Sequence, residues 1–286
     1  MTINSNLSPA EFALFQEYIK EQCGIDFNEE KSYLIESRLS KFLIKFGLTN
    51  FEELYRMLNK QKDVGLAEEI IDAITTNETL WFRDKTPWMI LEEVLLPAYI
   101  DEIRKGQRSK VRIWSAACST GQEPYSIAMC IDSYLKRFRV QDVTLSQFEI
   151  LATDISTTVL KLARMGKYDS ISMARGLESE YRDTYFRQEG RIWKLADTIK
   201  DAVVFRQFNL QNSFIGLGNF DTVFCRYVTI YFSEQFKKVV FSKIANALTE
   251  QGVLFIGNSE IFFDYKENYE MTQYKNGAFF RVRGDS

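Results

Sequence analysis

The stretch from Val111 to Ile127 constrains the fold of this 286-residue chain more than any other part of its sequence. A short β-rich run enters a series of small residues, passes through polar Gln122 and Glu123, and becomes an apolar segment of helical character. A strand, a small-residue turn and a helix present backbone N–H groups to a ligand at the carboxyl edge of an α/β sheet. Small side chains also let a ligand approach the main chain closely. The segment therefore predicts a ligand site at the edge of such a sheet.

A second apolar run, F-E-I-L-A-T-D, ends on Asp154. An acid at the end of a strand can accept hydrogen bonds from the hydroxyl groups of a ribose. The alternative is a helix cap after the strand, with Ser156 as a competing residue for that role. Together with the small-residue turn, Asp154 favours a cofactor that contains a nucleoside.

The composition excludes several classes of protein. Hydrophobic residues make up 45% of the chain and charged residues 26%, as in ordinary globular proteins. The net charge of −3 argues against a general nucleic-acid or lipid binder. Neither a membrane-spanning apolar run nor the pattern of a signal peptide is found, and the four cysteines lack C-x-x-C spacing. We therefore expect a cytoplasmic protein with reduced cysteines and no membrane insertion.

The chain contains no histidine. This excludes Ser-His and Cys-His nucleophilic pairs, imidazole bases and histidine metal ligands, and we expect no metal. Any reaction must use carboxylates, Tyr, Lys or Arg, or need little acid–base assistance. Methyl transfer from a sulfonium to a carboxylate is such a reaction, because glutamate, with an ordinary pKa near ~4.3, is already ionised at neutral pH.

The first hundred residues predict helices. Ser8–Glu11 and Thr49–Glu52 have the pattern of capping boxes, and Gly24 and Gly47 are expected helix ends. A further helix begins at Thr86-Pro87 and reaches about Arg104, with Pro97 as a candidate break. We expect a helical domain over residues 1–85, a linking helix and hinge over 86–110, and a second domain over 111–286.

The second domain alternates strands and helices, which predicts a mostly parallel sheet. Strands are expected near 111–114, 148–153, 202–206, 220–225 and 252–257. Asn276-Gly277 between two β-rich runs predicts a C-terminal antiparallel hairpin, which fits a Rossmann-like methyltransferase domain better than a dehydrogenase. The alternation fails over about 167–201, which is interpreted as an insertion, either a small subdomain or a lid.

Six segments match one family in order, from about Glu11 to Arg283. The chain resembles the chemotaxis receptor methyltransferases of the CheR type, which move a methyl group from S-adenosylmethionine to receptor glutamates and leave S-adenosylhomocysteine. The matching segments are T-T-N-E-T-L-W-F-R (75–83), I-W-S-A-A-C-S-T-G-Q-E-P-Y-S (113–126), L-A-T-D-I-S (151–156), F-N-L (208–210), F-C-R-Y-V-T-I-Y-F (224–232) and L-F-I-G-N-S-E (254–260).

The resemblance implies two catalytic residues, Arg83 and Tyr231. Arg83 would hold the substrate carboxylate by paired hydrogen bonds, and Tyr231 would face the methyl group without acting as a base. The resemblance places Asn209 and Leu210 beside the adenine and Glu123 near the amino group and the sulfonium of the cofactor. The full set of expected cofactor-binding residues is Asn77, Thr79, Arg83, Ala116, Glu123, Asp154, Asn209, Leu210 and Tyr227.

Ordinary structural roles compete with these assignments. Arg83 can be a surface arginine at a helix end, Glu123 a first-turn acid and Tyr231 a core aromatic. The chain also departs from the family, which usually has C-R-N-V where Tyr227 stands and G-H-S-E where Asn258 stands. The family's asparagine contacts the cofactor, so Tyr227 either replaces that contact by stacking or weakens binding.

Arg38, Lys41 and Lys45 fall on one face of a predicted helix. Such a face is often merely solvated, but the resemblance implies that it binds the acidic cytoplasmic helical domain of chemoreceptors. The turn Arg187–Arg191 in the insertion looks short, which favours a member that does not use a tethering peptide of the receptor. We expect a monomer. The competing functions are a cofactor-binding regulatory or scaffold protein and a methyltransferase of nucleic acids or small molecules.

Overall fold

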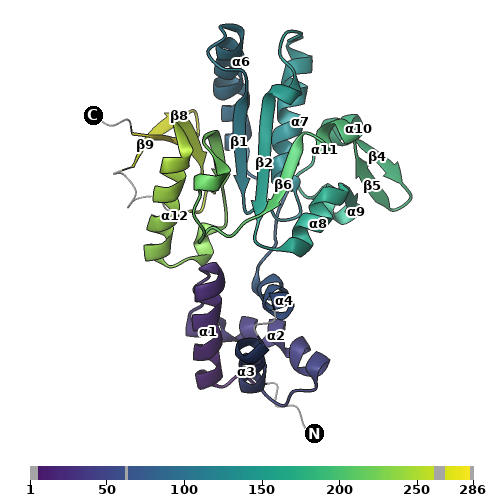
Figure 1. Cartoon of the computed structure of the whole chain (residues 1–286). Coiled ribbons are helices and arrows are strands. Elements are labelled where there is room, and N and C mark those ends of the chain that lie inside the picture. The colour runs from purple at the N-terminus through teal and green to yellow at the C-terminus, as the bar shows by residue number, and fades with distance from the viewer. Residues whose placement is uncertain (1–5, 62–63, 261–267, 284–286) are drawn as a thin grey trace.

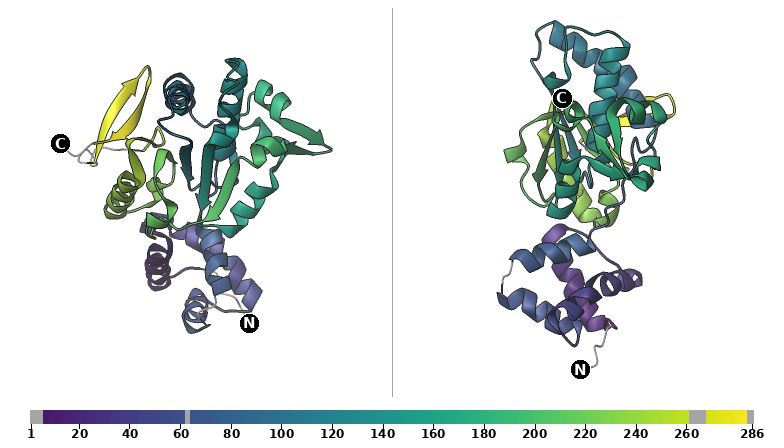
Figure 2. Two further views of the ribbon diagram at one scale, coloured as in Figure 1. Left: turned by 45° about the horizontal axis from the view of Figure 1, so that its top comes forward. Right: turned by 90° about the vertical axis from the view of Figure 1, so that its right-hand side faces the viewer.

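Helices α1 to α4 form a separate unit at one end of a sheet domain, and two further views show the same division (Figures 1 and 2). The structure is a computed structural model, and it describes residues 6–61, 64–260 and 268–283. Within these ranges no helix has the length and apolarity needed to cross a membrane.

The helical unit is built from amphipathic helices whose apolar faces converge on one core. Their bounds are α1 Pro9–Cys23, η1 Glu29–Lys31, α2 Ser32–Phe46, α3 Phe51–Gln61 and α4 Val64–Ile74. Phe15, Leu39, Phe51 and Ile70 are completely buried where these helices meet. Burial of such side chains contributes ~1.5–3 kcal/mol each, so the packed faces stabilise the unit.

The predicted capping box of α1 is confirmed, whereas that of α3 is shifted by one residue. The Ser8 side chain accepts a hydrogen bond from the Glu11 N–H, and the Glu11 carboxylate accepts one from the Ser8 N–H. In α3 the capping residue is Asn50 rather than Thr49, because the helix begins at Phe51 and Asn50 is the residue directly before it. Asn50 accepts from the Glu53 N–H at 2.9 Å, and Glu53 accepts from the Thr49 N–H at 2.7 Å.

Pro97 does not break the linking helix. The helix runs through α5 Thr86–Ile90, a π-helical turn η2 Leu91–Leu95 and α6 Leu96–Arg104. Proline lacks an N–H and crowds the preceding turn of an α-helix. The wider π-helical turn lies directly before Pro97, and the helix continues beyond it.

The sheet domain confirms the predicted fold class of a helical domain followed by a Rossmann-like domain. Among the described residues the strand order is β6-β2-β1-β7-β8-β10-β9, parallel except where β10 pairs with β8 and β9. The strands are β1 Val111–Ala116, β2 Phe148–Asp154, β6 Val203–Gln207, β7 Phe220–Cys225, β8 Leu248–Phe255, β9 Tyr269–Tyr274 and β10 Gly277–Val282. The helices and turns between them are α7 Gln122–Arg137, η3 Leu145–Gln147, α8 Thr157–Met165, η4 Ile215–Leu217, η5 Thr229–Tyr231 and α12 Glu234–Ala247.

The C-terminal hairpin is confirmed, but its turn lies one residue earlier than predicted. Gly277 pairs with Tyr274, so the turn consists of Lys275, with φ of 49°, and Asn276. Gly277 serves packing instead, because a Cβ atom there would lie 1.6 Å from the Thr86 side chain.

The insertion is a small folded subdomain beside the main sheet (Figure 1). It comprises β3 Lys167–Asp169, α9 Ser170–Ala174, α10 Ser179–Tyr185, β4 Phe186–Glu189, β5 Ile192–Leu195 and α11 Asp197–Lys200, with strand order β3-β5-β4. Its contact with the preceding chain is tight. The Trp81 N–H donates to the Arg175 carbonyl at 3.0 Å, and a Cβ atom on Gly176 would lie 2.2 Å from the Trp81 carbonyl oxygen. The subdomain therefore supports the segment that enters the linking helix.

Candidate functional site

A cavity lies where the loops that follow β1, β2, β6 and β7 meet the helical unit. It contains about 950 Å³ of empty space, part of it open to solvent. Most residues expected at the site line this one cavity, namely Asn77, Thr79, Arg83, Glu123, Asp154, Asn209, Leu210, Tyr227 and Tyr231.

The loop after β1 carries the main chain into the cavity in a left-handed conformation. Ala117 has φ of 59° and Ser119 has φ of 50°, and both line the cavity. Ala116, expected among the cofactor-binding residues, is not part of the lining. It is the last residue of β1 and is buried in the apolar core, so the residue next to it takes its place in the lining.

Asp154 is held by the main chain of two loops. Its carboxylate accepts a hydrogen bond from the Ser119 N–H at 2.8 Å and another from the Ser156 N–H at 3.0 Å. Burial raises the pKa of Asp154 above its usual value, although these hydrogen bonds oppose that shift. Ser156 caps α8 by accepting from the Val159 N–H, so Asp154 is not needed as the helix cap.

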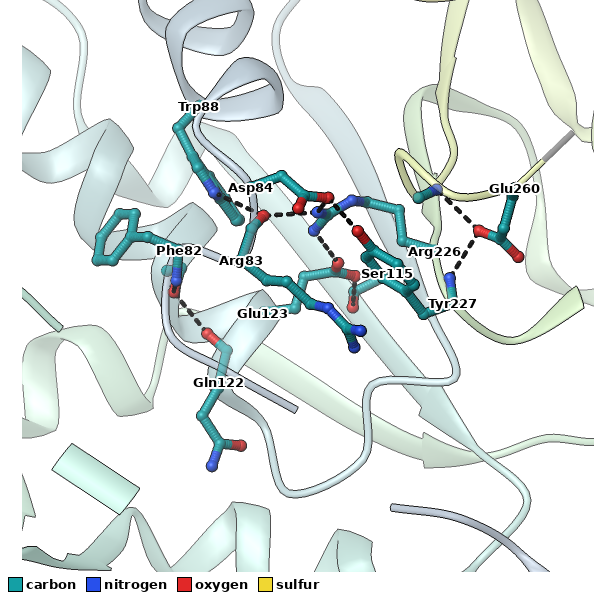
Figure 3. A network of polar contacts seen from close by, with 12 residues as sticks. Phe82, Arg83, Asp84, Trp88, Ser115, Gln122, Glu123, Arg226, Tyr227 and Glu260 are labelled. Carbon is teal, nitrogen blue, oxygen red and sulfur yellow. Dashed lines mark hydrogen bonds and ion pairs between the residues drawn. The ribbon is translucent and has the colours of Figure 1, made fainter. Parts of the chain in front are cut away.

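Arg226, which also lines the cavity, is the centre of a buried charge network (Figure 3). Its side chain is only 1% exposed, and it donates to the Glu123 carboxylate at 2.9 Å and to the Asp84 carboxylate at 2.7 Å. It also donates to the carbonyl of Arg83 at 2.5 Å. Arg226 thus ties the loop after β7 to the start of α7 and to the segment before α5. One cation between two carboxylates leaves an excess negative charge beside the cavity.

The motifs assign Arg226 no role of its own, although the sequence contains a signal for one. Every residue of β7 is buried, and an arginine directly after such a strand must find polar partners in the interior. The motifs likewise assign no role to Glu260, although it ends the G-N-S-E segment. Its carboxylate accepts from the N–H groups of Tyr227 and Gly257 at 2.7 Å each and from the Thr229 hydroxyl at 2.6 Å. It fixes the loop that contains Tyr227.

The segment from 75 to 85 is irregular, which lets Asn77, Thr79 and Arg83 face the same cavity. The Ser119 hydroxyl donates to the Asn77 carbonyl at 2.9 Å, which joins this segment to the loop after β1. Phe82 has a positive φ of 45°, and its N–H donates to the Ser126 hydroxyl of α7 at 3.1 Å. Both contacts fix the path of the chain on either side of Thr79.

Part of the cavity lining is apolar and lies next to the helical unit. This part includes Leu210, Ile155 and Ile25. The amide of Asn209 is already used within the protein, because it donates to the Gln22 carbonyl at 2.7 Å. Asn209 therefore joins the end of α1 to the sheet domain, and its amide oxygen accepts from the Gln211 N–H at 2.9 Å.

The three cations of α2 differ in their surroundings. The Arg38 guanidinium donates to the Ile74 carbonyl and to the Thr76 hydroxyl, so it holds the chain that leads into the cavity. Lys45 forms an ion pair with Glu69 at 2.5 Å. Lys41 is exposed and, within the described ranges, has no ion pair with a carboxylate.

No cluster of acidic or cysteine side chains suited to a metal ion is found in the part of the chain that the structure describes. Two family models match the sequence. The model described as "CheR methyltransferase, all-alpha domain" matches residues 10–75, and "CheR methyltransferase, SAM binding domain" matches residues 77–278.

Curated relatives match over nearly the whole chain. The "Chemotaxis protein methyltransferase Cher2" of Pseudomonas putida is 40% identical, with 96% of this chain and 98% of that protein covered. "Chemotaxis protein methyltransferase 1" of Pseudomonas aeruginosa is 41% identical over the same shares. "Chemotaxis protein methyltransferase" of Vibrio parahaemolyticus is 39% identical, with 97% and 98% covered.

The buried network makes a prediction about stability. Arg226→Met leaves the carboxylates of Glu123 and Asp84 without their cation, and the free energy of unfolding should fall by ~3–5 kcal/mol. The control is Arg104→Met, whose ion pair with Asp142 is about half exposed and should contribute less than ~1 kcal/mol. Urea unfolding at neutral pH measures both. Equal losses of unfolding free energy in the two variants would show that the buried network stabilises the fold no more than an exposed ion pair does.

Proposed function

The chain belongs to the CheR methyltransferase family, and on that premise we propose that it methylates the side-chain carboxylates of glutamates in bacterial chemoreceptors. Its general activity is S-adenosylmethionine-dependent methylation in chemotaxis. The products would be glutamyl methyl esters on the cytoplasmic helical domain of the receptor. The observation that carries the proposal is the single cavity in which Arg83, Glu123 and Asp154 meet.

The residues present fit the cofactor. Asp154 is a buried acceptor for the ribose hydroxyls, and the apolar part of the lining at Leu210 suits the adenine ring. Glu123 supplies a negative charge for the amino group at the methionine end, where Asn77 and Thr79 supply polar atoms. When bound, the cofactor supplies a methyl group on a positively charged sulfur, which an ionised carboxylate accepts without losing a proton.

Arg83 and Tyr231 would then act on the substrate. A guanidinium can hold a carboxylate by two parallel hydrogen bonds, which orients one oxygen for the reaction. Such orientation can lower a barrier by up to ~7–11 kcal/mol in ideal intramolecular cases. Tyr231 lines the same cavity and would shape the space for the reacting methyl group.

Residues 1–85 would recognise the receptor. The chain would act as a monomer in the cytoplasm, with the exposed Lys41 and the neighbouring Lys45 facing acidic helices of the receptor. Arg38 would support both this surface and the cavity, because it is bonded to the chain at Ile74 and Thr76. The hairpin β4–β5 has a two-residue turn, Gly190-Arg191, which supports a mode of action without a tethering peptide.

The direct test is to incubate the purified protein with S-adenosylmethionine and a receptor cytoplasmic fragment and to analyse the fragment by mass spectrometry. We expect a methyl ester on specific glutamates that is removed by mild base. Fragments with glutamine at those positions serve as the control. Cofactor binding without any methyl ester would instead support a regulatory or scaffold protein of the same fold.

The receptor surface makes a separate prediction. Lys41→Glu combined with Lys45→Glu should raise the KM for the receptor roughly tenfold at low salt, because each exposed pair contributes up to ~1 kcal/mol. The affinity for S-adenosylhomocysteine should not change, and added salt should reduce the difference from wild type. Lys105→Glu combined with Lys136→Glu, at two exposed lysines outside the helical unit, makes the same change of charge and is the control. Receptor kinetics that match the wild type would rule out this surface.

A further inference from the structure

Arg83 and Tyr227 form a stacked pair in the cavity (Figure 3). The central carbon of the Arg83 guanidinium lies 3.3 Å from the centre of the Tyr227 ring. Within the described ranges this guanidinium forms no ion pair or hydrogen bond with another side chain. Its donors therefore remain available to a ligand while its flat face rests on the ring.

Tyr227 is itself fixed by two acidic residues. Its N–H donates to Glu260 at 2.7 Å, and its hydroxyl donates to Asp84 at 2.6 Å. Its backbone is left-handed, with φ of 59°. Asparagine adopts this conformation readily, whereas a bulky residue requires surrounding structure to hold it there. The chain therefore keeps at Tyr227 the backbone geometry that suits the family's asparagine while presenting an aromatic ring.

The support for the ring extends to the buried network. Asp84, which accepts from the Tyr227 hydroxyl, also accepts from Arg226 at 2.7 Å. Burial and the Asp84 carboxylate raise the pKa of Tyr227, so the phenol keeps its proton and remains a donor. The ring is thus part of a rigid assembly before any ligand arrives.

We propose that Tyr227 is a positioning residue that holds the Arg83 guanidinium ready for the substrate carboxylate. This rests on the proposed function, in which Arg83 binds that carboxylate. A free arginine side chain loses rotamer freedom when it binds, and a stacked one has already lost it. Tyr227 then acts through Arg83 on the receptor substrate, and its replacement should affect substrate turnover much more than cofactor affinity.

A double-mutant cycle separates this role from direct contact with the cofactor. Tyr227→Leu should lower kcat/KM for the receptor about tenfold, since the stack is lost. Tyr227→Phe keeps the ring and should retain most of the activity. In an Arg83→Ala background, Tyr227→Leu should change kcat/KM by no more than about twofold, because its partner is already gone. The dissociation constant of S-adenosylhomocysteine should stay within about twofold of wild type in Tyr227→Leu.

Two results would contradict the proposed role of Tyr227. An equal loss on Tyr227→Leu with and without Arg83, together with weaker S-adenosylhomocysteine binding, would make Tyr227 a cofactor ligand and overturn the proposal. Loss of activity in Tyr227→Phe as large as in Tyr227→Leu would show that the hydroxyl, and not the stacked ring, matters.

A readout without turnover keeps the two proposals separate. Nitrogen-15 NMR of the arginine side chains should show the Arg83 signal displaced by the ring in wild type and in Tyr227→Phe. This change in the chemical shift of Arg83, which the nearby aromatic ring causes, should vanish in Tyr227→Leu. An unchanged Arg83 signal in Tyr227→Leu would refute the stack whatever the substrate is. If wild type forms no glutamyl methyl ester, the proposed function fails, while the NMR result still decides whether Tyr227 holds the guanidinium.

Discussion

The buried guanidinium of Arg226 joins three segments that meet beside the cavity. It binds Glu123 at the start of α7, Asp84 before α5 and the carbonyl of Arg83. Buried ion pairs contribute little net stability compared with apolar packing, because both charges lose their hydration. Their value lies in geometry, since each partner must stay in place to keep the others satisfied. The positions of Glu123 and Arg83 therefore depend on a residue that need not touch a ligand.

The parts outside the sheet support the same region. Arg38 of the helical unit binds the chain at Ile74 and Thr76, just before the cavity lining begins. The inserted subdomain contacts Trp81. The Trp81 N–H donates to the Arg175 carbonyl, and the ring centres of Trp81 and Tyr168 lie 4.8 Å apart in an edge-on arrangement. The segment between these anchors carries Asn77 and Thr79. If the proposed function holds, a receptor bound to the helical unit would contact a part of the chain that continues directly into the cavity lining.

The fold and most cavity residues could be predicted because their signals are local. Strand periodicity, the small-residue turn and the family motifs identify Asp154 and Glu123 without knowledge of tertiary contacts. Tertiary contacts add what these signals do not reveal. Ala116 points into the core one residue before the lining begins, and the Asn209 amide is engaged by Gln22, a partner distant in sequence. The stacking of Arg83 on Tyr227 likewise depends on a left-handed backbone that a motif does not reveal.

The proposed function requires that this cavity bind S-adenosylmethionine through Asp154. The decisive measurement is calorimetric titration of S-adenosylhomocysteine across acidic and neutral pH, with wild type beside Asp154→Asn. Burial raises the pKa of Asp154, so its carboxyl takes up a proton at a higher pH than an ordinary aspartate as the solution becomes acidic. Binding to wild type should therefore be tight at neutral pH and weaken as the pH falls through that raised pKa, while Asp154→Asn binds weakly without this step. Equal affinity for S-adenosylhomocysteine and equal pH dependence in the two proteins would show that Asp154 does not bind the cofactor.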